Sequence, residues 1–272
     1  MTQPNPNALT LTKHHGLGND FLVLFDPPDV NHALLAEQLC DRRTGVGADG
    51  LLLAEDAEGY AAKMTLYNAD GSRAEMSGNG IRCFAQAVAA RRGDLGPQLI
   101  LTDAGDRVVT LATTDDDLTI TARVEMGQVA ALDEPIGWAA LACHPDRPVA
   151  HLTMGNPHSV VGVDDVSVVD LSDLGSNVPQ VNLEIVEPGP ETNGITMRVH
   201  ERGAGITFAC GTGACASAYA AAQWGLATPI DGEIIVHMDG GTAVVGFDPE
   251  NPTLAILTGP ATHVATIDVA RS

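Results

Sequence analysis

Two short stretches decide how this chain folds: Ser77-Gly-Asn-Gly-Ile-Arg82 and Cys210-Gly-Thr-Gly-Ala-Cys215. Each opens a segment with apolar residues at three- and four-residue spacing, which predicts helices over 78–92 and 211–224. Glycines and a small polar residue at the start of a helix leave its first backbone N–H groups accessible to a ligand. The two stretches therefore predict two helices whose N-termini can bind an anion.

The surroundings of the two stretches also resemble each other. Aligning them pairs Ser77 with Cys210, and each stretch is preceded by a Gly-Asn turn, at 18–20 and at 155–157. The order of strand, Gly-Asn turn, further strands, small-residue loop and long helix thus occurs twice at nearly constant separation. We infer two copies of one α/β unit, fused near residue 125.

The remaining segments are mostly short and β-branched, with Gly, Pro, Asn and Asp between them, as is typical of strands. One more helix is predicted over 31–41. The predicted strands are 9–12, 21–25, 50–53, 61–67, 98–102, 108–112, 118–124, 150–154, 159–163, 182–186, 195–200, 234–238, 242–247 and 254–258.

Composition excludes several classes of protein. The 272 residues (28.2 kDa) are 44% hydrophobic and 18% charged. This hydrophobic content is enough for one large core or two modest ones, and it argues against global disorder. The formal net charge of −21 is unfavourable for binding nucleic acid or an anionic membrane. No stretch approaches the roughly 18 apolar residues of a membrane span. The first residues lack the basic and apolar pattern of a secretory signal, so we expect a cytoplasmic protein.

The five cysteines are an odd number in a chain of this kind, which argues against a disulfide framework. Cys210 and Cys215 have no nearby histidine pair, so no metal site is expected. The glycine-rich loops lack the lysine of a phosphate-binding loop and the acidic residue of a dinucleotide fold. The sequence thus indicates neither a metal nor a nucleotide cofactor.

Cys210 lies directly before a predicted helix. A helix N-terminus lowers the pKa of a thiol, so we expect Cys210 to be thiolate-prone and reactive rather than a buried core cysteine. Cys215 and Cys83 lie inside their helices and are expected in the core. A carboxylate-binding helix start beside a thiol indicates proton abstraction next to a carboxylate, and a base on each face of that carbon would invert it.

Seven motifs in this order resemble those of the diaminopimelate epimerase family and span nearly the whole chain. They are His15-Gly-Leu-Gly-Asn-Asp-Phe21, Arg43-Thr-Gly-Val-Gly-Ala-Asp-Gly-Leu51, Asn68-Ala-Asp-Gly-Ser72, Ser77-Gly-Asn-Gly80, Gly155-Asn-Pro-His158, Glu201-Arg-Gly-Ala-Gly205 and Ala209-Cys-Gly-Thr-Gly-Ala-Cys215.

The resemblance implies a cofactor-independent isomerase that converts LL-diaminopimelate to the meso form in lysine and peptidoglycan biosynthesis. It implies an α/β (α+β) fold of two pseudo-symmetric domains, each a curved, mostly antiparallel sheet around a central helix, with the active site between them. The domains would be 1–124, with 259–272 returning to it, and 125–258. The resemblance also allows a homodimer, although no residue indicates one.

The resemblance assigns roles residue by residue. Cys210 and Ser77 occupy the two proton-transfer positions, and Glu201 and His158 would tune the catalytic protons. The residues that would bind the substrate are Asn19, Asn68, Gly78, Asn79, Asn156, Asn182, Glu201, Arg202, Gly211 and Thr212. In this set Gly78-Asn79 and Gly211-Thr212 would hold the reacting carboxylate, and Glu201 with Arg202 would bind the far amino acid end of the substrate.

Ser77 departs from the family, which has its second catalytic cysteine there. Cys83 cannot replace it, because six helical residues separate the two by about 9 Å. A serine hydroxyl is a far weaker acid than a thiol and needs activation. The serine is either natural to an asymmetric Ser/Cys pair or a Cys→Ser substitution, and we favour the first because nothing else in the chain looks altered.

Two other readings stay open at the level of sequence. The protein could be a relative that racemises or dehydrates another amino acid, since relatives with one non-cysteine partner dehydrate. It could also bind diaminopimelate without turning it over. Asn182, Glu201 and Arg202 favour diaminopimelate over a cyclic imino acid. Exchange of the α-hydrogen with solvent would separate an enzyme from a binder.

Overall fold

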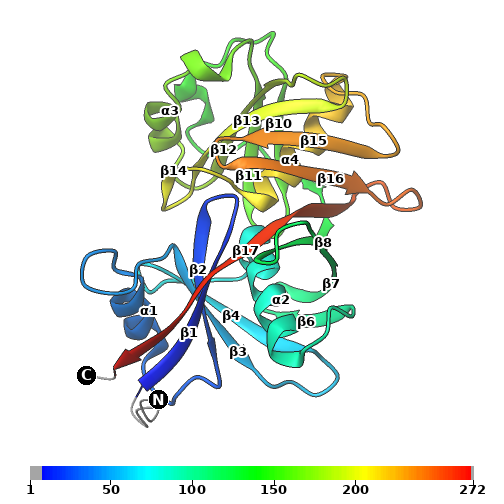
Figure 1. Cartoon of the computed structure of the whole chain (residues 1–272). Coiled ribbons are helices and arrows are strands. Elements are labelled where there is room, and N and C mark those ends of the chain that lie inside the picture. The colour runs from blue at the N-terminus through cyan, green and yellow to red at the C-terminus, as the bar shows by residue number, and fades with distance from the viewer. Residues whose placement is uncertain (1–7, 271–272) are drawn as a thin grey trace. The chain divides into compact units, whose positions relative to one another are not determined.

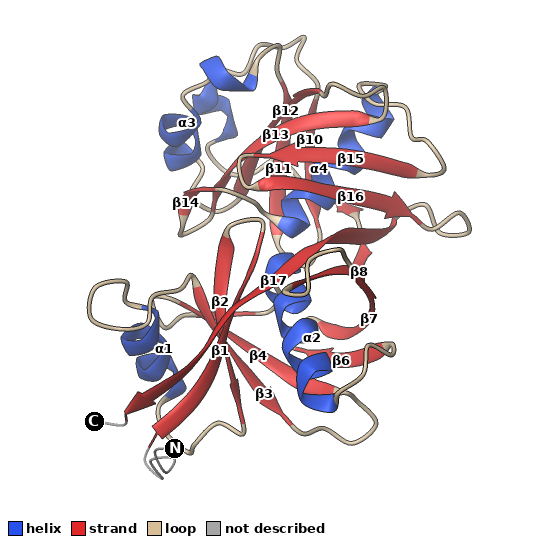
Figure 2. Ribbon diagram, in the orientation of Figure 1, coloured by secondary structure: helices blue, strands red, loops and turns tan. Residues whose placement is uncertain are grey.

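The computed structural model describes residues 8–270 and divides the chain into two compact units. Unit 1 is built from residues up to Ala122 and from Pro260 onward, and unit 2 from Arg123 to Gly259. Both are mainly strands with a few helices (Figure 2). This confirms the predicted α+β class.

Unit 1 is organised around one long helix, α2 (Gly78–Arg92), which lies against β1, β2, β4 and β7 (Figure 1). Every residue of α2 from Gly78 to Ala89 is buried, as expected for a helix inside a core. The other elements of unit 1 are β1 (Ala8–Gly16), β2 (Asn19–Phe25), α1 (His32–Cys40), β3 (Gly50–Glu55), β4 (Ala62–Asn68), β5 (Arg73–Ala74), β6 (Gln98–Thr102) and β7 (Gly105–Thr113). A further hydrophobic cluster packs α1 against β1, β2 and β3.

Unit 2 has the same plan around α4 (Gly211–Trp224), which lies against β10, β11, β12, β13, β15 and β16. Its other elements are β9 (Ala130–Ala131), the short 3₁₀ helix η1 (Trp138–Leu141), β10 (Val149–Thr153), β11 (Pro157–Gly162), η2 (Val166–Val168), α3 (Leu171–Asn177), β12 (Asn182–Pro188), β13 (Gly194–Glu201), β14 (Gly205–Thr207), β15 (Glu233–Met238) and β16 (Gly241–Phe247).

The strand pairing repeats between the units. In unit 1, β2–β3 and β4–β6 are parallel, whereas β1–β2, β3–β4, β4–β5 and β6–β7 are antiparallel. In unit 2, β11–β12 and β13–β15 are parallel, whereas β10–β11, β12–β13, β13–β14 and β15–β16 are antiparallel. Both central helices end at a left-handed glycine, Gly93 and Gly225. The predicted internal repeat is therefore confirmed.

Two strands belong to both units: β8 (Thr119–Gln128) and β17 (Leu254–Ala270). The first part of β17 pairs with β16, and the part from Thr262 onward pairs with β1. The sequence predicted only 254–258, because Gly259 and Pro260 resemble a strand terminator. Pro260 lies outside the runs that pair with β16 and with β1, so its missing N–H removes no hydrogen bond from either of these two ladders.

The three predicted helices are confirmed as α1, α2 and α4. The sequence missed α3, η1 and η2, since segments of seven residues or fewer are too short to show helical periodicity. Within residues 8–270, no helix has both the length and the apolar character needed to cross a membrane.

Candidate active site

The two helix starts share one capping geometry. Ser77 caps α2, with an extended backbone and its Oγ accepting a hydrogen bond from the Gly80 N–H at 3.0 Å. Cys210 caps α4 in the same conformation, and its Sγ accepts from the Gly213 N–H at 3.4 Å. Each capping atom thus lies where a helix N-terminus stabilises negative charge.

The Cys210 thiol is nevertheless not thiolate-prone in this structure, so the expectation of a lowered pKa is wrong. The residue is only 4% exposed. Burial raises its pKa well above the usual value, and the carboxylates of Glu201 and Glu184 raise it further. Hydrogen bonds from Thr212 and the Gly213 N–H act in the opposite direction but are outweighed. Cys83 and Cys215 are buried inside their helices, as predicted.

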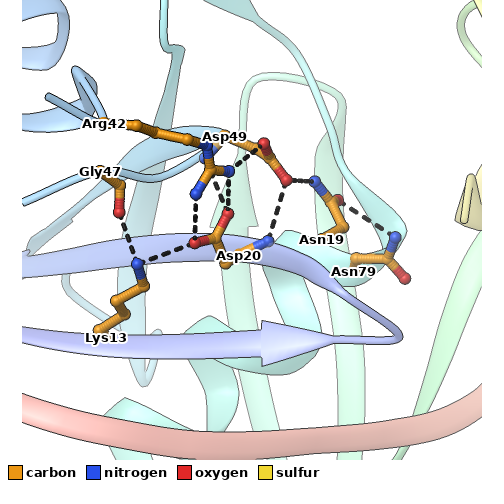
Figure 3. A network of polar contacts seen from close by, with 7 residues as sticks. All are labelled: Lys13, Asn19, Asp20, Arg42, Gly47, Asp49 and Asn79. Atoms are coloured by element: carbon orange, nitrogen blue, oxygen red, sulfur yellow. Dashed lines mark hydrogen bonds and ion pairs between the residues drawn. The ribbon is translucent and has the colours of Figure 1, made fainter. Parts of the chain in front are cut away.

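In unit 1, a hydrogen-bond network holds Asn19 and Asn79 in defined orientations (Figure 3). Asn19 Nδ2 donates to Asp49 Oδ2 at 2.7 Å, and Asn79 Nδ2 donates to Asn19 Oδ1 at 3.1 Å. The fully buried Arg82 donates to Asn79 Oδ1 at 2.6 Å. The turn between β1 and β2 brings Asn19 to this place, because Leu17 and Gly18 both adopt positive φ.

Asp20 anchors the other end of this network (Figure 3). Two nitrogens of Arg42 donate to the Asp20 carboxylate, at 2.6 and 3.1 Å, and Arg42 also donates to Asp49 Oδ1 at 2.7 Å. Lys13 adds an ion pair at 2.9 Å. Burial alone would raise the pKa of Asp20, but the bonds from Arg42 and Lys13 hold it below its usual value. Sequence reasoning missed Arg42 and Asp49 as supports of Asn19.

Asn68 lies at the end of β4, in an exposed turn. Its Nδ2 donates to Ser72 Oγ at 3.0 Å, and the Ser72 hydroxyl in turn donates to Asp70. These hydrogen bonds fix the turn but do not join Asn68 to the network around Asn19.

In unit 2, a continuous series of contacts links β11 to the start of α4. Asn156 Nδ2 donates to Thr212 Oγ1 at 3.2 Å, and Thr212 Oγ1 lies 3.5 Å from Cys210 Sγ. Asn156 Oδ1 is 3.0 Å from His158 Nε2. Asn156, His158 and Thr212, all predicted site residues, are therefore brought together beside Cys210.

The second ring nitrogen of His158 contacts a residue that the sequence did not single out. His158 Nδ1 is 2.6 Å from Glu184 Oε1, and both side chains have no exposure to solvent. Burial raises the pKa of Glu184, although the charge and hydrogen bond of His158 oppose the rise. The only signal in the sequence is one acidic residue inside an otherwise apolar strand, Asn182-Leu-Glu-Ile-Val186.

Asn182, Glu201 and Arg202 meet at the β13–β14 hairpin. Asn182 Oδ1 accepts from the backbone N–H of Arg202 at 2.8 Å, and Glu201 Oε1 accepts from the Thr207 hydroxyl. The Arg202 side chain is exposed and has no carboxylate partner within the part of the chain that the structure describes. A guanidinium in this state can bind an incoming carboxylate through two hydrogen bonds.

Unit 1 provides a helix N-terminus capped by a half-buried hydroxyl. Unit 2 provides a helix N-terminus capped by a buried thiol, and an exposed guanidinium. Among residues 8–270, no group of three or more His, Cys, Asp and Glu side chains is arranged to hold a metal.

Comparison with known proteins places this arrangement in a family. The family model for diaminopimelate epimerase matches residues 11–132 and 151–264. The chain belongs to the diaminopimelate epimerase family. A diaminopimelate epimerase of Desulforapulum autotrophicum is 36% identical, over 95% of this chain and 98% of its own. One of Halothermothrix orenii is 35% identical, over 95% and 96%. The resemblance inferred from the motifs is confirmed, as is the expectation of an isomerase.

A solved structure agrees with the fold of this member of the family. A structure described as a predicted epimerase of Pseudomonas aeruginosa superposes with a TM-score of 0.76, covering 97% of this chain and all of the other. The sequence identity is only 12%, so the match shows the shared fold alone.

Proposed function

We propose that this protein epimerises LL-2,6-diaminopimelate to meso-diaminopimelate by proton transfer at one α-carbon, without a cofactor, in lysine and peptidoglycan biosynthesis in the cytoplasm. The observation that carries the proposal is the position of Cys210 as the cap of α4. There, its sulfur lies within reach of two donors, the Gly213 N–H and the Thr212 hydroxyl. Membership of the family supports the substrate.

The start of each central helix would bind the carboxylate next to the reacting carbon. The first N–H groups of a helix point out of its N-terminus, so those of α2 at Gly78 and Asn79 and those of α4 at Gly211 and Thr212 would donate to the carboxylate. Negative charge that develops on the carboxylate as the proton leaves is stabilised by these donors and by the helix dipoles.

Proton transfer would use Cys210 on one face of the α-carbon and Ser77, or a water held by it, on the other. When Cys210 acts as the base, its sulfur takes the α-hydrogen, and the C–H electron pair delocalises into the carboxylate. A proton from the other face completes the inversion. Because burial keeps the Cys210 pKa high, its thiolate is a strong base once formed.

The far end of the substrate carries a second carboxylate and ammonium group. Arg202 would bind that carboxylate and Glu201 the ammonium. Asn182 supports this role by holding the Arg202 backbone in place. The asparagines Asn19, Asn68 and Asn156 would contact the polar groups of the substrate.

Proton NMR of LL-diaminopimelate in D2O tests the proposal, with the protein as it stands beside Ser77→Cys and Ser77→Ala. We expect deuterium at the α-carbon, meso product, a higher rate in Ser77→Cys and a lower rate in Ser77→Ala. Meso product without deuterium would contradict the proton-transfer mechanism.

Ser77 also favours a second candidate, a catalytically impaired form that binds diaminopimelate. In that case only Ser77→Cys would incorporate deuterium. Absence of exchange in all three proteins would contradict the substrate and point to a racemase or dehydratase of another amino acid.

A further inference from the structure

Glu184 is a buried carboxylate that the proposed proton transfer does not use. It lies on β12 with no exposure to solvent, and one oxygen contacts His158. None of the described residues gives its other oxygen, Oε2, a hydrogen bond. Burying a carboxylate with an unpartnered oxygen costs stability. Since a buried apolar side chain would avoid that cost, the carboxylate calls for another explanation.

The hydrogen bonds between His158 and Cys210 all run the same way from donor to acceptor. Asn156 presents its Oδ1 to His158 Nε2 and donates with its Nδ2 to Thr212 Oγ1. An oxygen facing Nε2 requires a hydrogen on that nitrogen. Thr212 Oγ1 accepts from Asn156, so its own hydrogen can point to Cys210 Sγ, 3.5 Å away. Each group from His158 to Thr212 thus donates to the next, and the last donor faces the sulfur.

Glu184 determines this direction at its origin. A carboxylate oxygen 2.6 Å from Nδ1 of His158 requires one proton between the two atoms. Because Asn156 Oδ1 faces Nε2 as well, both contacts hold together only when His158 and Glu184 share two protons, as an imidazolium beside a carboxylate or as a ring protonated on Nε2 beside a carboxylic acid. Without Glu184, the buried ring loses the group that carries or balances the second proton, and a neutral ring can carry its hydrogen on Nδ1 and reverse every bond that follows.

The carboxylate also lies next to the thiol itself. A Cβ added to Gly213 would lie 2.6 Å from Glu184 Oε1 and 3.3 Å from Cys210 Sγ, so both atoms border the same space beside the helix start. In a direct electrostatic role, the Glu184 charge would oppose thiolate formation. The positioning role and the direct role therefore predict opposite effects of removing the carboxylate.

The internal repeat provides a comparison within the same chain. Aligning the copies on their parallel strand pairs puts Phe21 at the position of His158 and Leu52 at that of Glu184. Both counterparts are buried and apolar. The polar pair is therefore found in the copy that carries the cysteine and is absent from the copy that carries the serine.

We propose that Glu184 is a positioning residue for Cys210. It holds His158 with Nε2–H toward Asn156, and so fixes a series of donors that ends with the Thr212 hydroxyl on the sulfur. The role of Cys210 in proton transfer rests on the proposed function, but the positioning itself does not. The titratable groups that face this site are His158 on β11, Glu201 on β13 and Cys210 at the start of α4.

The test is the pH dependence of Cys210 alkylation by iodoacetamide, quantified by peptide mass spectrometry, with the half-buried Cys143 as internal reference. We expect Glu184→Met to slow alkylation at fixed pH about tenfold, the factor for losing one hydrogen bond to a charged acceptor. Glu184→Gln should be slowed less, because its amide can donate to Nδ1 and keep Nε2 protonated. Faster alkylation in both variants would show a direct charge effect and overturn the proposal, as would no change in Glu184→Met.

A double-mutant cycle tests whether Glu184 acts through Thr212. Thr212→Val should slow alkylation in the otherwise unaltered protein and add nothing in Glu184→Met, since the donor it removes is already misdirected. Additive effects would overturn the proposal.

Nitrogen NMR of the histidine rings needs no Glu184 variant, so it tests the positioning role of Glu184 even if Glu184→Met fails to fold. The protein as it stands, with His158→Gln for assignment, should show a protonated Nε2 on His158 at neutral pH. An unprotonated Nε2 would overturn the proposal. None of these readouts uses turnover, so an inactive protein that passes them would contradict the proposed function and leave the positioning role intact.

Discussion

The start of α2 in unit 1 and the start of α4 in unit 2 have the same backbone but different chemistry around them. Ser77 is half-buried, and the Asp49 carboxylate, which is linked through Asn19 to Asn79 of α2, is 41% exposed. Cys210 is buried, and the nearby pair of His158 and Glu184 is fully excluded from solvent. The repeated backbone therefore supplies anion binding in both copies. The acid–base character of each copy comes from side chains on the strands beside the helix.

The strands before the two Gly-Asn turns also differ, but here unit 1 carries the polar residue and unit 2 the apolar one. His14 on β1 pairs with Phe21, and at the matching place in unit 2 Leu152 pairs with His158. His14 is buried and contacts Gln86 Oε1 at 2.8 Å, whereas Leu152 is buried and apolar. Each copy thus buries one imidazole at this site, but on different strands and with different partners.

The largest effect is expected when the two helix caps, Ser77 and Cys210, are made identical. Cys210→Ser should lower the rate of deuterium incorporation into diaminopimelate by about 10³-fold or more, because it removes the group best suited to proton transfer. The circular dichroism spectrum should not change, since serine caps a helix well. An equal loss in Cys210→Ser and Ser77→Ala would contradict the asymmetry between the copies.

The buried imidazole of unit 1 predicts a pH dependence of stability. Burial lowers the pKa of His14 to about 4, against the raising effect of its bond to Gln86. Between pH 6.5 and 4 the unfolded chain binds a proton that the folded one does not, so stability falls as the pH drops through this window. The fall should reach about 3 kcal/mol.

Urea unfolding at a series of pH values measures this dependence. His14→Gln should flatten it, and replacement of the exposed His144 serves as the control. An unchanged slope in His14→Gln would contradict the assignment to His14.

The space beside each helix start can be probed with alanine. A Cβ at Gly213 would lie 2.6 Å from the fixed Glu184 carboxylate, whereas one at Gly80 would lie 3.0 Å from Ser77 Cβ. Both variants gain the same helix propensity, so Gly80→Ala is the matched control. We expect Gly213→Ala to lower the free energy of unfolding by about 2 kcal/mol and Gly80→Ala by less than about 1 kcal/mol. The reverse order would show that the carboxylate can move aside.

The smallest expected effect concerns the hydrogen bond between Asp49 and Asn19 in unit 1. Asp49→Ala removes the acceptor that orients Asn19, so the KM for diaminopimelate should rise about fivefold, as for the loss of one hydrogen bond. Stability should change by less than about 1 kcal/mol, because the ion pair with Arg42 is exposed. Asp103→Ala, which breaks the exposed pair with Arg73, is the matched control and should leave KM unchanged.

The sequence predicted the features that depend on local chemistry. Ser77 and Cys210 could be placed as helix caps because small residues before an apolar periodic segment have few other structural uses. Glu184 could not be recognised, since its role depends on the parallel pairing of β11 with β12 and on its packing against Gly213. The raised pKa of Cys210 was missed for the same reason. The position at the helix start can be read from the chain, but the burial and the two nearby carboxylates cannot.

The pairing of β17 with β1 has a consequence for the protein as it is synthesised. Unit 2 is one continuous stretch of chain and can close as soon as β16 and the first part of β17 have left the ribosome. Unit 1 is begun first, but β1 lacks its second neighbour until residues 262–270 have been made. During that interval β1 presents an open strand edge, the kind of surface on which unfinished chains associate. The unit translated first is therefore the one completed last.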